Sequence, residues 1–393
     1  MGDINEQVLA NNNVALILLD SSSAFDTVDH GILLSKLEQE YNIRNKALAL
    51  IKSYLEQRTF SVTVNGEVSS EKPLQYGVPQ GSLLGPLLYI MYIRELEDLL
   101  TSLGVKFHFY ADDCALYLSF NQINNSEAQT NLNTCLAKIN NWMTNNFQKL
   151  NTEKTKLQIF KPNSPSLEIN IKFHDQTINC NDQVCLLGVK LGNTINFGPF
   201  ISQKVQSCHF HLRNLFNIRN CLPIHSRIIL VTNMILSKLD YCNSILICSN
   251  KKSLHPLQLI LNRAIRFIFN LKRRTHIKPF LKKLHILPID FRIRFKVCLF
   301  GFKIVNKISP QYLTDVFPLF RSTSNMPLRI ATGGRDELMF EVKLQKKDSI
   351  YYKIKSEWNR LPYEIRQITS ISLFKSKLKT LFFNEAFSNT DDV

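Results

Sequence analysis

Residues 106–120 read KFHFYADDCALYLSF, and this stretch decides the fold that we expect. Apolar and aromatic side chains recur at every second position up to Tyr110 and again from Cys114, which is the period of β-strands. Ala111, Asp112 and Asp113 lie between these two strands. We therefore expect a hairpin with two adjacent carboxylates at its tip, although an Asp-Asp pair on its own is more often a solvated turn.

A third carboxylate follows a second predicted strand. Residues 13–20 read NVALILLD, a continuous apolar run typical of a buried strand, and Asp20 ends it. Three carboxylates brought together from two strand ends repel one another unless cations lie between them. Oxygen-only ligands select Mg²⁺ or Mn²⁺. We therefore expect Asp20, Asp112 and Asp113 to bind two Mg²⁺ ions, with Mn²⁺ possible, in a phosphoryl-transfer site.

The charge of the chain is unevenly distributed. Residues 1–120 hold 8 Lys and Arg against 15 Asp and Glu, whereas residues 201–393 hold 33 against 12. An acidic catalytic part beside a strongly basic half suits a polyanionic partner. Within residues 263–296, Asp290 is the one acid among many cations. Either a phosphate-binding face or a solvated surface explains this block, whose first cations are Arg263, Arg266, Lys272, Arg273 and Arg274.

Cysteine spacing and apolar runs indicate the compartment. The nine cysteines include no C-x-x-C pair, which favours free thiols in a reducing environment. The first residues, MGDINEQVLANNN, lack the basic and apolar segments of a secretory leader. The longest apolar run, residues 83–93, is too short to cross a bilayer and contains Gly85-Pro86. We expect an intracellular, soluble protein with no membrane partner.

The remaining periodicity predicts an α+β chain that becomes helical after residue 200. Apolar residues at helical spacing predict helices over residues 31–41, 44–58, 86–100 and 128–147. Asn65-Gly66 is typical of a type I′ turn and joins strands predicted over residues 59–64 and 67–74. Further strands are expected at residues 156–160, 167–173 and 184–191, and further helices at residues 200–219, 226–239 and 254–271.

Three smaller features have two interpretations each. Phe25 follows a small polar turn that ends at Ala24, so its ring is either a wall beside a bound nucleotide or a core residue. Gln80 and Gly81, in QYGVPQGS, form either a loop that contacts a ligand or an ordinary loop before a helix. Lys154 either donates a proton to a departing pyrophosphate or faces solvent.

Taken together, these segments resemble the reverse transcriptases of non-LTR (LINE-type) retrotransposons, a class of transposable element, especially the jockey and chicken-repeat branches. The similarity is strong over residues 14–190. It rests on LLDSSSAFDTVDHGILLSKL, QYGVPQGSLLGPLLYIMYI, FYADD, NWMTNNFQKLNTEKTK and VCLLGVKL, which occur in the family's order. LDYCNSIL and WNRLPYEIRQITSISLFKSKLKTLF resemble the C-terminal part of the same open reading frames.

The resemblance implies a right-hand polymerase palm, an antiparallel sheet with helices on one face. It assigns metal binding to Asp20, Asp112 and Asp113, a nucleotide steric gate to Phe25 beside Ala24, and nucleotide contacts to Gln80 and Gly81. It also implies a primer-grip hairpin, and its nucleic-acid-binding residues would be Leu186, Gly188 and Lys190. The implied domains are a palm over residues 1–197, a helical thumb over 198–271 and a basic C-terminal region over 272–393.

The implied activity is RNA-directed DNA polymerisation, a nucleotidyl transfer from dNTP to a DNA primer on an RNA template. The implied location is nuclear, with a cytoplasmic ribonucleoprotein stage. The family carries a fingers region upstream of its first carboxylate strand, whereas 19 residues precede Asp20, so we expect an N-terminally truncated copy. Two alternatives stay open: a catalytically inactive relic that at most binds nucleic acid, and an RNA-templated RNA polymerase, against which the bulk of Phe25 argues.

Overall fold

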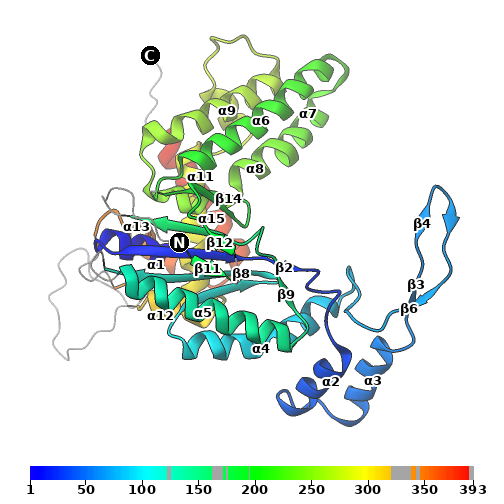
Figure 1. Ribbon diagram of the computed structural model, residues 1–393. Helices are drawn as coiled ribbons and strands as arrows, with labels where there is room; N and C mark the ends of the chain where they lie inside the picture. The colour runs from blue at the N-terminus through cyan, green and yellow to red at the C-terminus, as the bar shows by residue number, and fades with distance from the viewer. Residues whose placement is uncertain are drawn as a thin grey trace. The chain divides into compact units, whose positions relative to one another are not determined.

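The structure is a computed structural model, and it describes residues 1–121, 125–161, 171–173, 176–193, 195–319, 338–341 and 346–388. Its backbone divides into two compact units (Figure 1). The first unit is residues 10–184, and the second combines residues 1–9 with residues 185–393. Each unit is described by itself below. No helix in the described part of the chain is both long enough and apolar enough to cross a membrane.

The first unit is built around a four-stranded antiparallel sheet with strand order β10-β1-β8-β7. These strands are β1 (Asn13–Leu19), β7 (Lys106–Tyr110), β8 (Asp113–Phe120) and β10 (Lys156–Phe160). β1 lies in the middle, paired with β8 on one side and β10 on the other. Its continuous apolar sequence follows from this central place, because nearly every side chain of the strand is buried.

Two long helices pack on one face of this sheet (Figure 1). α4 (Gly85–Ser102) contributes Leu96 and Leu100 to the shared core, and α5 (Asn125–Asn145) contributes Leu136 and Ile139. A second core lies between α4, α2 (His30–Gln39) and α3 (Asn45–Leu55). The predicted α+β class and the antiparallel sheet with helices on one face are thereby confirmed.

Short strand pairs complete the first unit. They are β2 (Ser21–Ser22) with β9 (Lys149–Leu150), β3 (Thr59–Phe60) with β6 (Lys72–Pro73), β4 (Thr63–Val64) with β5 (Glu67–Val68), and β11 (Ile171–Phe173) with β12 (Gln176–Ile178). The Asn65-Gly66 turn is confirmed, since both residues have positive φ, 51° and 90°. The strand predicted over residues 59–64 is interrupted between β3 and β4, and of residues 167–173 only β11 lies within the described residues.

The strand predicted over residues 184–191 is wrong as a single element. The chain turns back at Leu187 and Gly188, whose φ values are 47° and 77°, and forms a hairpin of β13 (Gln183–Leu186) and β14 (Val189–Gly192). The sequence does not predict a turn at Leu187, because a bulky branched residue is uncommon at positive φ. The hairpin shape implied by the resemblance is present at these residues.

The second unit is mainly helical, as predicted. Its longest helices are α6 (Gly198–Ile218), α9 (Lys251–Phe269), α11 (Ile289–Val305) and α15 (Ile371–Phe387). Its shorter segments are α1 (Gly2–Leu9), η2 (Arg219–Cys221), α7 (Ile224–Val231), η3 (Thr232–Leu236), α8 (Ser237–Asp240), η4 (Asn243–Cys248), α10 (Lys278–Lys283), α12 (Gln311–Val316), α13 (Ile350–Asn359) and α14 (Tyr363–Arg366).

An aromatic cluster forms part of the core of this second unit. The Trp358 ring lies 5.8 Å from Phe374, and Phe374 stacks on Phe302 at 4.4 Å. Gly301 permits this packing, because a Cβ at its position would lie 2.8 Å from the Trp358 ring. α1 joins the same unit through Asn5, whose side-chain oxygen accepts a hydrogen bond from the Ile350 amide at 3.0 Å. The predicted domain limits at residues 197 and 271 stay predictions.

Candidate active site

The three predicted carboxylates are neighbours at one end of the sheet. Leu19 of β1 pairs with Cys114 of β8, so the next position along each strand sets Asp20 opposite Asp113. Asp113 also pairs with Tyr110 across the β7–β8 hairpin, whose two turn residues are Ala111 and Asp112. The register of three strands therefore brings together residues that are about ninety positions apart in the sequence.

The carboxylates disfavour one another's charge. Partial burial raises the pKa of Asp113, and the charges of Asp112 and Asp20 raise it further. Asp20 Oδ2 is shielded from solvent and accepts no hydrogen bond, although the Lys154 ammonium lies 3.5 Å away. A cluster of repelling oxygen ligands with an unsatisfied oxygen is suited to a hard divalent cation.

A complete coordination shell is nevertheless not formed. Among the residues that the structure describes, no group of three or more His, Cys, Asp or Glu side chains is arranged to hold a metal ion. The donor chemistry and the position of Asp20, Asp112 and Asp113 at the end of the sheet fit a divalent ion.

A pocket of about 490 Å³ opens beside these carboxylates. It brings together seven residues singled out from the sequence, namely Asp20, Ala24, Phe25, Gln80, Gly81, Asp112 and Lys154. Asp113 is the one predicted catalytic residue that does not line it. The pocket belongs entirely to the first unit.

Phe25 is held as one wall of this pocket. Ser23 takes a positive φ of 54°, which turns the chain sharply after β2. The Phe25 ring then stacks on Tyr89 of α4, with ring centroids 4.7 Å apart and planes 29° apart. Tyr89 is buried, and burial, followed by the charge of Asp112, raises the pKa of its hydroxyl. Phe25 therefore has a rigid backing and contacts both the core and the pocket.

The loop that carries Gln80 is attached to the same segment of chain. The amide of Val78 donates to the Phe25 carbonyl at 2.8 Å, and Gln80 Nε2 donates to Asp26 Oδ1 at 2.9 Å. Gly77 is required at the crossing, because it has a φ of 89° and a Cβ there would lie 2.9 Å from the Asp26 backbone. Gly81 has a φ of 78° and faces open space.

Lys154 lines the same pocket from the connection between β9 and β10. Its ammonium is 3.5 Å from Asp20 Oδ2, and its side chain is 68% exposed. The amide of Asn151 donates to the Asp20 carbonyl at 2.9 Å, and the Asn151 side chain accepts from the Lys154 amide at 3.2 Å. Both sequence interpretations of Lys154 therefore have support, because it is solvent-facing and beside the carboxylates.

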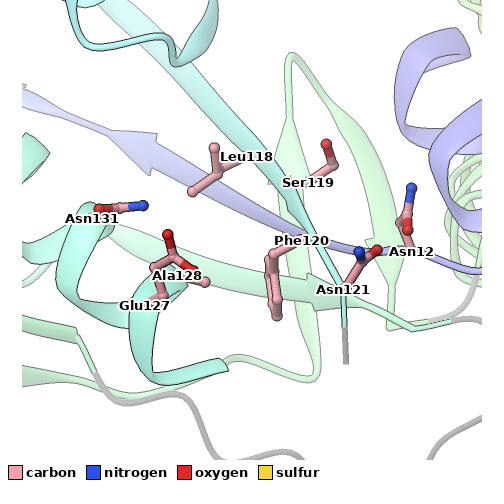
Figure 2. A pocket seen from close by; sticks show the side chains of 8 residues that line it. All are labelled: Asn12, Leu118, Ser119, Phe120, Asn121, Glu127, Ala128 and Asn131. Atoms are coloured by element: carbon pink, nitrogen blue, oxygen red, sulfur yellow. The ribbon is translucent and has the colours of Figure 1, made fainter. Parts of the chain in front are cut away.

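A second cavity in this unit, of about 340 Å³, lies at the opposite end of β8 (Figure 2). Ser119 and Phe120 line it from the strand, and Glu127 and Asn131 line it from α5. It contains none of the residues predicted for the site. Eight residues lie along β8 from Asp113 to Phe120, so this cavity is separate from the carboxylate pocket.

The predicted nucleic-acid-binding residues all belong to the second unit or its boundary strand. Leu186 ends β13, Gly188 forms the hairpin turn and Lys190 is exposed on β14. The Leu187 carbonyl accepts a hydrogen bond from the Tyr241 hydroxyl at 2.7 Å, which fixes the turn.

The five predicted basic residues divide into two groups. Arg263 contacts His209 Nδ1 at 2.9 Å, and Arg266 donates to the Thr275 carbonyl at 3.4 Å, so both have structural contacts. Lys272, Arg273 and Arg274 are exposed in the connection between α9 and α10. The exposed group is the better candidate for a phosphate contact.

Sequence reasoning missed the residues that support the pocket from behind. Asp26, Tyr89 and the β2–β9 pairing orient the lining residues but have no chemical signature in the sequence. Lys36 was expected only as part of a helix and is instead buried among polar partners. A lysine between apolar helix positions was the one available signal.

The comparisons with known proteins agree with this geometry. The family described as reverse transcriptase (RNA-dependent DNA polymerase) matches residues 4–191. Over that segment the chain is similar to the reverse transcriptases, and the relatives below are of the non-LTR retrotransposon type.

The chain is similar to several proteins of Drosophila melanogaster. The probable RNA-directed DNA polymerase from transposon BS is 29% identical over 265 residues, which are 64% of this chain and 28% of that protein. The RNA-directed DNA polymerase from mobile element jockey is 27% identical over 264 residues, with the same shares. The transposon X-element protein is 41% identical over 106 residues, 26% of this chain and 12% of that protein. The chain thus spans about 28% of the length of the first two relatives.

Among solved structures, this chain is similar to a telomerase from Candida albicans in complex with a fragment of telomeric RNA. The similarity covers 69% of this chain and 51% of the telomerase chain. The TM-score is 0.34 and the sequence identity 12%, a likeness too weak to carry an argument about the fold.

Proposed function

We propose that this chain is the polymerase part of a non-LTR retrotransposon reverse transcriptase, which extends a DNA primer on an RNA template with dNTP substrates. The observation that carries the proposal is the convergence of Asp20, Asp112 and Lys154 with Phe25 and Gln80 around one pocket at the end of an antiparallel sheet. Similarity to the family over residues 4–191 supports it.

In this proposal Asp20, Asp112 and Asp113 hold the divalent ions, Mg²⁺ or Mn²⁺. Bound there, two such ions would supply the Lewis acidity that activates a primer 3′-hydroxyl and stabilises a leaving pyrophosphate. The strand register supports this assignment, because it makes Asp20 and Asp113 neighbours. Partial burial, followed by the charges of Asp112 and Asp20, raises the pKa of Asp113, and carboxylates that repel one another favour cation binding.

Three other residues act on the nucleotide in this proposal. Lys154 donates a proton to the departing pyrophosphate, for which its ammonium beside Asp20 is well placed. The Phe25 ring, backed by Tyr89, excludes a ribose 2′-hydroxyl. Gln80 and Gly81 contact the incoming nucleotide or the template from a loop that is tied to Asp26.

Binding of the nucleic acid strands is assigned to the second unit. The Leu186–Lys190 hairpin is proposed as the primer grip, with residues 198–271 as the thumb and residues 272–393 as a basic C-terminal region. The exposed cations Lys272, Arg273 and Arg274 would contact phosphates. A nuclear location with a cytoplasmic ribonucleoprotein stage follows from the retrotransposon family.

Primer extension on an RNA template with Mg²⁺ and dNTPs tests the proposal. We expect the wild type to extend the primer and the Asp112→Ala/Asp113→Ala variant to lose extension. The matched control is Asp98→Ala, which removes an exposed carboxylate of α4 that is 72% exposed. If neither the wild type nor the control extends the primer while salt-sensitive binding to the primed template persists, the chain is a nucleic-acid-binding relic.

A further inference from the structure

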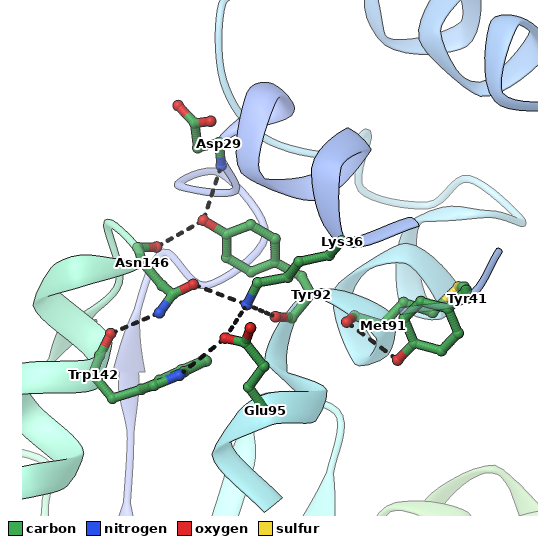
Figure 3. A network of polar contacts seen from close by, with 8 residues as sticks. All are labelled: Asp29, Lys36, Tyr41, Met91, Tyr92, Glu95, Trp142 and Asn146. Atoms are coloured by element: carbon green, nitrogen blue, oxygen red, sulfur yellow. Dashed lines mark hydrogen bonds and ion pairs between the residues drawn. The ribbon is translucent and has the colours of Figure 1, made fainter. Parts of the chain in front are cut away.

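Lys36 is a buried cation that the proposed chemistry does not use. It lies on α2 with 7% of its surface exposed. Its ammonium donates three hydrogen bonds, to the Tyr92 carbonyl at 2.9 Å, to Glu95 Oε2 at 2.8 Å and to Asn146 Oδ1 at 2.9 Å (Figure 3). The rings of Tyr92 and Trp142 each lie 5.1 Å from the nitrogen. All three donors of the ammonium are used, and three helical segments meet at this one charge.

The acidic partner of Lys36 completes a closed network. Burial acts to raise the pKa of Glu95, but the hydrogen bond and charge of Lys36, with the Trp142 indole, bring it below its usual value. Trp142 Nε1 donates to the same Glu95 oxygen at 3.3 Å, and Asn146 Nδ2 donates to the Trp142 carbonyl at 2.9 Å (Figure 3). Because each partner also binds another, the network fixes Asn146 rather than merely touching it.

Asn146 leads directly to one wall of the pocket. Its side chain is held by Lys36, and its carbonyl accepts from the Tyr92 hydroxyl at 2.8 Å. β9 begins three residues later and pairs with β2, the strand that follows Asp20. The next amide, that of Asn151, donates to the Asp20 carbonyl at 2.9 Å. The position of Asn146 is thus transmitted through a five-residue segment to the Asp20 backbone.

The Tyr92 hydroxyl is also connected to the segment that leads to Gln80. It accepts a hydrogen bond from the Asp29 amide at 3.4 Å, beside the start of α2 (Figure 3). The neighbouring His30 Nε2 contacts the Gly77 carbonyl at 2.8 Å, three residues before Gln80. One hydroxyl, held next to one buried cation, therefore lies between the segment that carries Asp20 and the segment that leads to Gln80.

We propose that Lys36, acting with the Tyr92 hydroxyl, is a positioning residue that sets the spacing between the Asp20–Lys154 wall and the Gln80 wall of the pocket. The proposal rests on the proposed polymerase function. Lys36 touches neither the pocket nor any reacting atom, since it is absent from the lining and is enclosed by α2, α4 and α5. Its effect on the reaction is transmitted through Asn146 and Tyr92.

Mn²⁺ binding gives a readout that does not depend on activity. Free Mn²⁺ is measured by electron paramagnetic resonance during titration of the full chain, for the wild type, Lys36→Met and Tyr92→Phe. Lys52→Met is the matched control, because Lys52 is 57% exposed on α3 and pairs with exposed Glu56. We expect Lys36→Met and Tyr92→Phe to weaken Mn²⁺ binding about tenfold, because a small displacement of a binding residue such as Asp20 is costly. The control variant should bind Mn²⁺ as the wild type does.

Single-turnover primer extension then separates positioning from general damage. If Asp20 and Lys154 are displaced in a variant, the rate of the chemical step should fall about tenfold or more. The dNTP concentration that gives half of the maximal rate should change much less. Lys36→Arg, which retains the charge, should recover part of the rate. If Lys36→Met does not fold, Tyr92→Phe decides, because it removes one hydroxyl and leaves the cation in place.

The possible results separate the two proposals. A folded Tyr92→Phe chain with wild-type Mn²⁺ affinity and wild-type rate would overturn the positioning role and leave the polymerase intact. Weakened Mn²⁺ binding in the variants, together with no extension by the wild type, would reject the polymerase and retain the positioning of the carboxylates.

Discussion

Two charged clusters lie a short distance apart in the first unit, and they are built on opposite principles. Around Lys36, opposite charges and carbonyl dipoles satisfy every donor, and the pKa of Glu95 is lowered. Around Asp113, like charges meet, and partial burial together with the charges of Asp112 and Asp20 raises the pKa of Asp113. The first cluster stabilises the folded chain, whereas the second weakens it in the absence of a bound ion.

The difference shows which charged cluster stabilises the folded chain and which one destabilises it. Active sites concentrate repelling groups because their chemistry needs them, and the surrounding structure must compensate. Here the compensating network is attached to the same segments that carry the carboxylates, through Asn146 and β9. Substitutions in either cluster should therefore change stability in opposite directions.

Loss of the Lys36 cation should cause the largest change. Lys36→Met removes one donor from the Tyr92 carbonyl and one from the Asn146 side chain, and it removes the cationic partner of Glu95. We expect the free energy of unfolding to fall by about 3 kcal/mol, at the low end for a broken buried ion pair because Glu95 is partly solvated. Urea denaturation measures it, and Lys52→Met should change stability by less than about 0.5 kcal/mol.

Lys204 of the second unit is a buried cation that can be compared with Lys36, because its ammonium also donates to carbonyl acceptors. Its ammonium donates to the Tyr241 carbonyl at 2.6 Å and to the Lys238 carbonyl. Burial lowers its pKa to about 8 from the usual 10.5, opposed by nearby Cys242, Cys208 and Asp240.

The direction of the pH dependence follows from this lowered pKa. Between about pH 8 and 10.5 the unfolded chain binds more protons at Lys204 than the folded chain does, so the contribution of Lys204 to stability rises with pH in this window and is lost as pH falls through 8. The pH dependence of urea denaturation should differ between the wild type and Lys204→Met by this slope. Parallel pH profiles would contradict the prediction.

Phe25→Ala tests whether the Phe25 ring, which lines the pocket beside the carboxylates, discriminates between deoxyribose and ribose. Because the ring is stacked rigidly on Tyr89, its removal should open space for a 2′-hydroxyl. We expect discrimination between dNTPs and rNTPs to fall by about tenfold or more, equal to about 1.4 kcal/mol. Competing single-nucleotide insertions measure this ratio, and unchanged discrimination would exclude the gate.

Asp113→Asn should have the smallest effect on stability, and of the opposite sign to Lys36→Met. The raised pKa means that Asp113 destabilises the folded chain once pH rises through that pKa. Removing the charge should stabilise the chain at pH 7 by about 0.5–1 kcal/mol, a value discounted for solvent screening of this exposed group. Below about pH 4, where carboxyls are protonated, the advantage should disappear. Chemical denaturation at both pH values checks this.

The sequence predicted that the three carboxylates lie near one another, but it did not predict the contacts that hold the pocket residues in place. Asp20, Asp112 and Asp113 stand at strand ends, and both strands have clear apolar patterns, so their convergence followed from local signals. The Asn65-Gly66 turn was predictable for the same reason, whereas the Leu187-Gly188 turn was hidden because leucine rarely takes a positive φ.

Long-range contacts account for the rest. Lys36 meets Asn146 across 110 positions and Gln80 meets Asp26 across 54, and neither pairing leaves a periodic trace in the sequence. Phe25 and Gln80 were distinguished from core and loop residues only through the family resemblance. The candidate residues thus stand in recognisable local patterns, whereas the contacts that position them depend on pairings between distant parts of the chain.

Thermal unfolding with and without Mg²⁺ tests the central claim most directly, that the three carboxylates form a metal-binding polymerase site. The account predicts that saturating Mg²⁺ raises the unfolding temperature of the wild type by roughly 5 °C, because the ion binds only the folded chain. Asp113→Asn should start from a higher temperature and gain little from Mg²⁺. An equal rise in both proteins, or no rise in the wild type, would contradict the account.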